Sequence, residues 1–316
     1  SWQTRTARGD PARFLGGRYF RLIEVSGLVK SYGELRAVNG VDLQIAEGEV
    51  FALLGPNGAG KSTTVEILEG HRTATAGTVR VLGMDPETGG RAYRERIGIV
   101  LQETAIENEL MVREAIDIYG AMYPRRRQTG ELIEMVGLHE KADARIKTLS
   151  GGQRRRLELA LGIVGDPEVI FLDEPTTGFD PSARRQAWTI IDNLRSLGRT
   201  ILLTTHYMDE AQALSDRVAV IRSGEIVAEG TPDTIGGRQD AATEIAFSLP
   251  AGTAPPGFGE VHLDSGRYKF SVEEPTRMLH KLTGWALDND VELASLTVER
   301  PSLEDIYLEL AGEAGE

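Results

Sequence analysis

The chain has 316 residues, of which 41% are hydrophobic, 26% are charged and none is cysteine. This composition is typical of a globular protein with one large domain or two of ordinary size, and it excludes disordered and collagen-like chains. The lack of cysteine excludes disulfide bridges, thiolate zinc sites and a cysteine nucleophile. No apolar run approaches the roughly 18 to 20 residues that cross a bilayer, so we expect any membrane role to depend on a partner.

The formal net charge of −13 repels polyanions and disfavours a general nucleic-acid-binding protein. Two local exceptions are the arginine triplets at residues 125–127 and 154–156, which we interpret as solvated surface or the rim of a docking site. Residues 1–20 hold four arginines and one acidic residue, but no apolar segment of the kind that secretion signals contain. We expect them to form a peripheral basic arm.

Strand patterns open the next part of the chain. Residues 21–50 alternate between polar and apolar as strands do, and a short apolar run at 51–54 then leads into a glycine-rich turn. A helix is predicted after this turn, at 64–69. The order of strand, glycine-rich turn and helix is typical of an α/β domain.

The middle of the chain combines helices with short apolar runs. A strand is predicted at 97–101, and we interpret the mostly helical stretch at about 103–165 as an inserted helical subdomain. Within it, one apolar face of a helix is formed by Leu157, Ala160, Leu161 and Val164. Continuous apolar runs, as expected for strands buried on both faces, lie at 169–172, 201–203 and 218–221.

The amino-acid composition of the sequence changes after residues 231–232. The pair Gly236 and Gly237 and the tract 250–257 have the composition of linkers. A hairpin around 261–272, a helix, a strand and a closing helix from Ser302 then predict a small α+β module. We therefore expect three parts: a basic arm at 1–20, an α/β domain at 21–235 and an accessory domain at 236–316.

The glycine-rich turn fits the pattern G-x-x-x-x-G-K-S. Glycines let the backbone curl so that successive N–H groups point at phosphate oxygens, and the positive end of the following helix adds to the attraction. We expect Lys61 to reach the β and γ phosphates of a nucleotide and the hydroxyl of Ser62 to bind Mg²⁺. The predicted nucleotide-binding residues are Gly55, Pro56, Asn57, Gly58, Ala59, Gly60, Lys61, Ser62 and Thr63.

Two carboxylates follow the buried run at 169–172, at the carboxyl end of a predicted strand. Phosphoryl transfer to water needs a second group on the metal and a group that orients the attacking water. We predict that Asp173 holds Mg²⁺, commonly through water, and that Glu174 polarises the water as general base. A glutamate with an ordinary pKa of about 4.3 is a weak base, so positioning and charge stabilisation must supply most of the acceleration.

A second predicted anion-binding site lies at the N-terminus of the helix that begins at about residue 150. Ser150 lies near its N-cap, and Gly151 and Gly152 expose backbone donors. One nucleotide does not need two such sites from the same chain. We therefore expect a head-to-tail dimer in which a C2 contact encloses two ATP molecules.

Over roughly residues 21–235, this order of motifs resembles that of the nucleotide-binding subunits of ABC transporters. Residues 55–63 resemble the family's Walker A motif, 149–153 its LSGGQ signature, and 169–175 its Walker B motif with the catalytic glutamate. The resemblance implies a P-loop NTPase core with an inserted helical subdomain. It also implies that ATP is bound at the signature of the partner subunit by Ser150, Gly151, Gly152 and Gln153.

The same resemblance assigns four single residues. Tyr32 is implied to stack on adenine, and Gln102 to join Mg²⁺ to the transmembrane interface. His206 is implied to lie at the γ-phosphate and to act in catalysis with Lys61 and Glu174. Asp180 occupies the position that crosses the dimer. Its neighbour Phe179 departs conservatively from the commoner leucine.

The resemblance implies an ATPase, with ATP and Mg²⁺ as cofactors, that powers a membrane transporter. Residues 300–310, RPSLEDIYLEL, resemble the tail of ATPases from daunorubicin-resistance exporters, so we expect export of drugs, lipids or other hydrophobic compounds. The expected partners are an integral-membrane permease and a second ATP-binding subunit, either a copy or a relative, and no nucleic acid. The expected location is peripheral, on the cytoplasmic face of the cell membrane.

Two other interpretations stay open at this point. One is an ABC ATPase that acts on nucleic acid or ribosomes. Such proteins generally carry two cassettes, cysteine zinc sites or a very long coiled-coil insertion, and this sequence has none of them. The other is that the accessory domain senses a ligand or a partner and gates the ATPase.

Overall fold

The computed structural model describes residues 21–100, 106–237, 242–250, 253–258, 262–264, 266–305 and 307. The predicted basic arm and Gln102 lie outside the described residues. The chain divides into two compact units, Ser1–Pro232 and Asp233–Glu316. Every helix in the described ranges is too short or too polar to cross a lipid bilayer.

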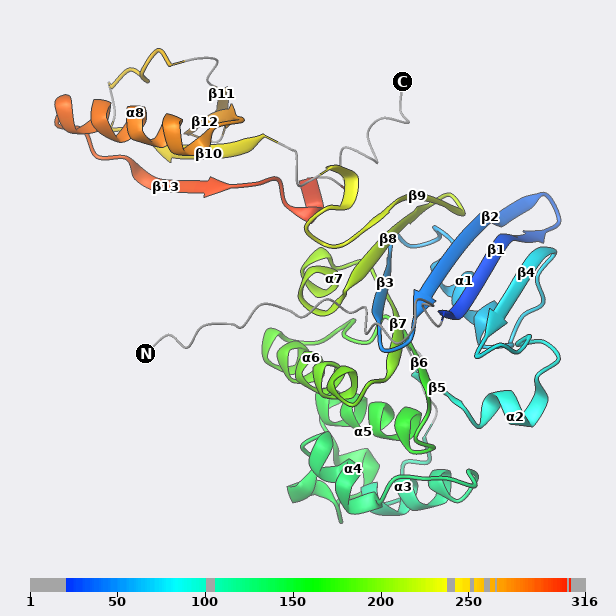
Figure 1. The fold of residues 1–316 in the computed structure, drawn as a ribbon. Coiled ribbons are helices and arrows are strands. Elements are labelled where there is room, and N and C mark those ends of the chain that lie inside the picture. Colours follow the sequence, from blue (N-terminus) through cyan, green and yellow to red (C-terminus); the bar gives the residue numbers. More distant parts are fainter. Residues whose placement is uncertain are drawn as a thin grey trace, which may run out of the picture. The chain divides into compact units, whose positions relative to one another are not determined.

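A six-stranded sheet forms the centre of the first unit (Figure 1). Its first five strands run parallel, and β9 pairs antiparallel with β8 at the edge. The residues of β3 and β7 are buried throughout, as expected for strands covered on both faces. In spatial order the strands are β5 (Ile97–Val100), β6 (Val169–Asp173), β7 (Thr200–Thr205), β3 (Val50–Leu54), β8 (Arg217–Arg222) and β9 (Glu225–Gly230). The predicted α/β class is confirmed.

Helix α6, one of the helices beside this sheet, carries a single apolar face. On α6 the buried residues Ala187, Ile190, Ile191 and Leu194 recur at the spacing of one helix face. Proline at the start of α6 fits the first turn, where its missing N–H has no partner to lose. The helices beside the central sheet are α1 (Lys61–Leu68), α2 (Gly90–Arg94), α6 (Pro181–Ser196) and α7 (Met208–Leu214).

A three-stranded antiparallel sheet packs against the central sheet of this unit. Its strands, in the order β2-β1-β4, are β2 (Leu35–Ala46), β1 (Arg21–Tyr32) and β4 (Ala76–Val81). Their alternating pattern places Ile23 and Leu43 inward, where they share one core with Phe51 and Phe171 of the central sheet. Because both sheets share this core, the loop between β3 and α1 has a firm support.

Between β5 and β6 the chain forms a group of helices that lies at one end of the unit (Figure 1). It comprises α3 (Val112–Gly120), α4 (Thr129–Met135), two short 3₁₀ turns, His139–Lys141 and Ile146–Thr148, and α5 (Gly151–Ile163). Helix α5 packs on β5 and on α3. Its predicted apolar face is confirmed, since Leu157, Ala160, Leu161 and Val164 are all buried.

The second unit is an antiparallel sheet with one long helix. In spatial order its strands are β11 (His262–Asp264), β12 (Arg267–Val272), β10 (Thr243–Ser248) and β13 (Ala294–Glu299), accompanied by α8 (Pro275–Asp288) and the 3₁₀ turn Ile235–Gly237. Its core contains Ile245, Phe247, Phe270 and Leu282. Ser302 and Asp305 cap the first turn of the last helix reciprocally. The expected α+β module is confirmed for the described residues.

Candidate active site

The loop between β3 and α1 adopts a backbone that only glycine accepts easily. Gly58 and Gly60 have φ values of 81° and 106°, and Gly60 is the N-cap of α1. A Cβ atom on Gly60 would lie 2.4 Å from the backbone oxygen of Ala37. Glycine has no side chain that could accept the first N–H groups of the helix. Those donors are therefore available to an anion.

Gly60→Ala is expected to lower the free energy of unfolding by about 3 kcal/mol or more, because backbone strain adds to the clash with Ala37. Gly58→Ala is the matched control, since its Cβ would meet no described atom within 4 Å and only the strain of about 1 kcal/mol applies. Chemical denaturation measures both losses. Equal losses would contradict the role given to the close contact.

Lys61 lies at the start of α1 and joins the loop to the carboxylate of Glu174. Its Nζ donates hydrogen bonds to the backbone oxygens of Gly55 at 2.7 Å and Pro56 at 3.2 Å. The same Nζ lies 3.4 Å from Oε1 of Glu174, and the Lys61 side chain is 4% exposed. A buried cation is therefore held at the point where the loop meets β6.

Ser62 and Asp173 form the oxygen-rich part of the site. The Ser62 hydroxyl donates to Oδ1 of Asp173 at 3.4 Å, and Oγ1 of Thr204 donates to the same oxygen. A hydroxyl and one carboxylate suit Mg²⁺, which prefers oxygen ligands and keeps waters and substrate phosphates for its other positions. No group of three or more His, Asp or Glu side chains in the described ranges could hold a metal ion alone. The residues present therefore fit a magnesium ion shared with phosphates.

Glu174 follows β6 in an uncommon backbone conformation, with a φ of 46°. Its backbone N–H donates to the backbone oxygen of Thr204 and, at 3.0 Å, to the Thr204 hydroxyl. Its Oε2 accepts a hydrogen bond from the Thr177 hydroxyl at 3.1 Å and lies 3.3 Å from Nδ1 of His206. Burial raises the pKa of Glu174, but Lys61, the Thr177 hydroxyl and His206 together hold it below the usual value. Glu174 is therefore ionised at neutral pH.

His206 directly follows β7 and is positioned by its neighbours. Its ring packs on the ring of Tyr207, with centroids 4.0 Å apart. The guanidinium of Arg184, from α6, lies 4.4 Å from the Tyr207 ring centroid and is paired with Asp209 at 3.0 Å. This stack keeps the imidazole beside Glu174.

The structure thus brings together five of the residues selected from the sequence: Lys61, Ser62, Asp173, Glu174 and His206. Sequence reasoning missed two neighbours, Thr177 and Thr204. The signal for Thr204 was a polar residue at the end of the apolar run 201–203.

Tyr32 lies at the last position of β1 and is 40% exposed. Two cations approach its ring, Nζ of Lys30 at 5.1 Å and the guanidinium of Arg72 at 5.7 Å from the centroid. An exposed aromatic ring of this kind offers a stacking surface to a planar base. Its assignment to adenine stays a prediction.

The second predicted anion-binding site lies at the start of α5. Ser150 caps α5, since its hydroxyl accepts from the N–H of Gln153 while the Gln153 side chain accepts from the N–H of Ser150. The described residues 150–156, 158, 177–180, 182, 183 and 186 line a hollow of about 630 Å³. No residue of the loop 55–63 is among these described lining residues.

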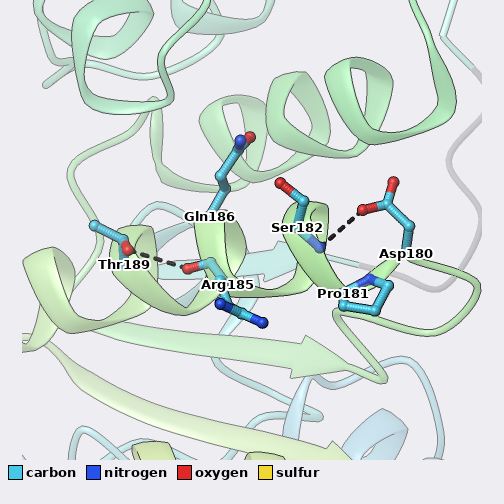
Figure 2. A pocket seen from close by; sticks show the side chains of 6 residues that line it. All are labelled: Asp180, Pro181, Ser182, Arg185, Gln186 and Thr189. Carbon is cyan, nitrogen blue, oxygen red and sulfur yellow. Dashed lines mark hydrogen bonds between the residues drawn. The ribbon is translucent and has the colours of Figure 1, made fainter.

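Asp180 contributes to the same hollow from the N-cap of α6. One of its carboxylate oxygens accepts hydrogen bonds from the N–H groups of Ser182 and Ala183 at 2.8 and 2.9 Å. Figure 2 shows the adjoining hollow, where Ser182 lies beside Asp180 and Gln186 projects farther along α6. This hollow has a volume of about 520 Å³. The helix cap fixes the direction of the Asp180 carboxylate.

A further buried carboxylate lies at the end of α1. Glu69 has a side chain that is 1% exposed, and neither of its oxygens accepts a hydrogen bond from a described residue. Nδ1 of His71 lies 3.2 Å from its Oε2. Burial, together with the charges of Asp173 and Glu66, raises the pKa of Glu69 from 4.5 to about 8. The neutral carboxyl is therefore the favoured form in the folded protein at neutral pH.

The stability of the Glu69→Gln variant, relative to that of the parent protein, is expected to increase as the pH rises. A carboxyl with a raised pKa takes up a proton on folding, so its contribution is complete at low pH and is lost between its unfolded and folded pKa values. Between pH 6 and pH 8 the stability difference in favour of the variant is expected to widen by about 2 kcal/mol. Urea unfolding at the two pH values measures this difference, and a constant difference would contradict the assignment.

The two arginine triplets are largely engaged within the fold. Arg127 pairs with Glu131 and Asp166, and Arg156 donates to backbone oxygens of the segment 136–137. Arg155 is 6% exposed, so the expectation that its triplet is solvated surface is wrong for this residue. Successive residues of a helix point about 100° apart, and the middle arginine faces inward.

Comparisons with known proteins place this site in a family. A family model described as "ABC transporter" matches residues 38–177, and one for the C-terminal domain of ABC transporter domain-containing proteins matches 243–302. The daunorubicin resistance ATP-binding protein DrrA3 of Streptomyces coeruleorubidus is 36% identical over 303 residues, which cover 92% of this chain and 96% of that protein. The chain belongs to the ABC transporter ATP-binding proteins. The predicted enzyme class, an ABC ATPase, is confirmed.

Two other similar proteins extend the comparison of this ABC ATPase. The Nod factor export ATP-binding protein I of Rhizobium meliloti (strain 1021) is 42% identical over 238 residues, which cover 73% of this chain and 70% of that protein. A solved structure of the ATP-binding cassette MJ0796, dimeric and bound to ADP and phosphate in a post-hydrolysis state, has a TM-score of 0.60 and 25% identity. It covers 66% of this chain and 98% of that chain. These relatives give no support to the nucleic-acid or ribosome alternative.

Proposed function

We propose that this ABC ATPase hydrolyses ATP to drive a membrane exporter for drugs, lipids or other hydrophobic compounds. The observation that carries the proposal is the convergence of Lys61, Ser62, Asp173, Glu174 and His206. These residues follow β3, β6 and β7 at the carboxyl ends of the parallel strands, where α/β proteins bind their ligands.

In this proposal the residues 55–63 hold the phosphates of ATP. Lys61 exchanges its hydrogen bonds to the backbone oxygens of Gly55 and Pro56 for the β and γ phosphates. Tyr32 stacks on adenine. Ser62 and Asp173, with Gln102 from outside the described residues, hold Mg²⁺, which neutralises charge on the phosphates when it is bound.

Glu174 orients the attacking water and accepts its proton. Its lowered pKa makes it a weak base, so its main contribution is to fix the water in line with the γ-phosphate. In this proposal His206, which lies 3.3 Å from the Glu174 carboxylate, contacts the γ-phosphate oxygens. Lys61 supplies positive charge beside both groups.

The second ATP-binding surface supports a head-to-tail dimer. The hollow beside Ser150 and Asp180 has no residue of the loop 55–63 among its described lining residues. This supports the proposal that the two anion-binding sites are separate surfaces of one subunit. A second subunit, either a copy or a relative, uses both sites by placing its signature residues Ser150–Gln153 over the first subunit's ATP. The dimeric MJ0796 cassette is consistent with such an arrangement.

The proposed transport role rests on the relatives. Their names assign them to daunorubicin resistance and to Nod factor export. By analogy, an integral-membrane permease carries the cargo, and the helical subdomain at about 103–165 transmits the motion of the dimer to it. In this proposal 21–235 is the ATP-binding domain, 236–316 is an accessory domain and 1–20 is a basic arm, at the cytoplasmic face of the cell membrane.

Inside-out membrane vesicles from cells that produce the tagged chain test this proposal. We expect them to accumulate a radiolabelled hydrophobic drug such as daunorubicin with ATP, and not with a non-hydrolysable analogue. Purification in mild detergent should recover a hydrophobic polypeptide in a fixed ratio to the chain. Uptake that is equal in vesicles carrying Glu174→Gln, or a chain recovered entirely off the membranes, would contradict it.

A further inference from the structure

Arg155 is a buried cation on α5 that the proposed nucleotide contacts leave unexplained. Its guanidinium donates from Nε to the backbone oxygen of Pro175 at 3.1 Å and from Nη2 to that of Asp173 at 3.4 Å. Its Nη1 donates to Oε2 of Glu158 at 2.8 Å. The two backbone oxygens belong to the residues on either side of Glu174.

This segment needs support because Glu174 has a φ of 46°. A non-glycine residue in such a conformation costs about 1–3 kcal/mol and persists only where its surroundings hold it. The peptide between Asp173 and Glu174 is held at both ends, with its N–H bound to Thr204 and its C=O accepting from Arg155. The next peptide bond, between Glu174 and Pro175, has no N–H to donate because proline lacks one. The carbonyl oxygen of Pro175 itself accepts a hydrogen bond from Arg155.

The charge of Arg155 is balanced within the same helix. Glu158, three residues later and 8% exposed, accepts from the guanidinium and also lies 3.6 Å from Nε of Arg154. A buried guanidinium without a carboxylate partner would be strongly unfavourable. Among the described residues, the planar guanidinium fork serves three acceptors at fixed angles, which the ammonium of lysine cannot do.

We propose that Arg155 is a positioning residue that sets the backbone of Glu174 from the signature helix. Ser150, at the N-terminus of α5, faces the second ATP of the proposed dimer, whereas Glu174 serves the first. Arg155 therefore connects a movement of α5 to the catalytic carboxylate of the opposite site. This inference rests on the proposed function of Glu174.

Arg155→Lys in the 316-residue chain is the test. We expect kcat for ATP hydrolysis to fall at least about tenfold, because a small displacement of a catalytic group is costly, while KM and the Kd for ATP change less than about twofold. The matched control is Arg127→Lys. Arg127 is a mostly buried arginine that pairs with Glu131 and Asp166, each at 2.9 Å, and it lies outside the hollow beside Ser150. We expect it to keep the parental kcat.

An unchanged kcat in Arg155→Lys would overturn the inference, as would equal losses of kcat and ATP affinity in both arginine variants. If Arg155→Lys does not fold, Glu158→Gln decides, because it retains the guanidinium and removes its charged partner. It is expected to lower kcat about threefold at unchanged Kd, and an unchanged kcat overturns the inference. Glu174→Gln distinguishes a failure of the proposed function from a failure of this inference. Full activity of Glu174→Gln would defeat the proposed function. An inactive Glu174→Gln together with a fully active Arg155→Lys would defeat only the inference about Arg155.

Discussion

Replacing Glu174 with glutamine is expected to lower ATP hydrolysis by about 10²- to 10⁴-fold while ATP still binds. Glutamine has the same shape, and its amide oxygen can accept the Thr177 hydrogen bond, but it carries no negative charge to orient and deprotonate water. Phosphate release at saturating ATP measures the loss, and equilibrium binding measures the retained affinity. Gel filtration with ATP is expected to show a stable dimer, because the step that reopens it is blocked.

Glu168→Gln is the matched control for this variant. Glu168 precedes β6 at the end opposite to Glu174 and pairs with Arg96 at 2.5 Å, with 47% of its side chain exposed. Exposed ion pairs contribute little to stability, so the rate and the melting temperature are expected to stay near those of the parent. Undiminished phosphate release by Glu174→Gln would rule out the assigned role.

The parts of the fold that sequence predicted best depend on local signals. Apolar runs at 169–172 and 218–221 became buried strands, and the glycine loop became the turn between β3 and α1. The position of Asp173 and Glu174 at the end of such a run was enough to place them at the carboxyl edge of the sheet. A helix of one apolar face was equally visible in α5.

The residues that shape Glu174 were hidden because they depend on pairing between distant segments. Thr204 reaches Asp173 only because β6 and β7 pair in a register that sets these two residues side by side. Arg155 belongs to a triplet for which the sequence predicts solvated surface or the rim of a docking site, since sequence alone does not show which side of α5 meets the loop after β6. Glu69 looked like the last residue of a helix, and its burial depends on the tertiary fold around it.

Lys61→Met is expected to weaken ATP binding about 100-fold and to abolish hydrolysis. Methionine fills a similar buried volume, so the loop is expected to keep its fold around a side chain that is 4% exposed. The variant loses charge-assisted hydrogen bonds to phosphate, each worth about 1.5–3 kcal/mol, and about 3 kcal/mol corresponds to roughly a 100-fold change in Kd. Titration with a fluorescent ATP analogue measures it.

Lys147→Met provides the control, since Lys147 is an exposed lysine that pairs with Glu109 in the helical subdomain. Its affinity for ATP is expected to equal that of the parent. Removing Lys61 also takes away one of the charges that lower the pKa of Glu174, so burial is opposed less and that pKa is expected to rise. Glu174→Gln and Lys61→Met therefore separate ATP binding from catalysis. Glu174→Gln loses only the rate of hydrolysis, whereas Lys61→Met loses both the rate and the affinity for ATP. ATP affinity that survives in Lys61→Met would mean that the loop binds phosphate through its backbone N–H groups and that the lysine acts on Glu174 instead.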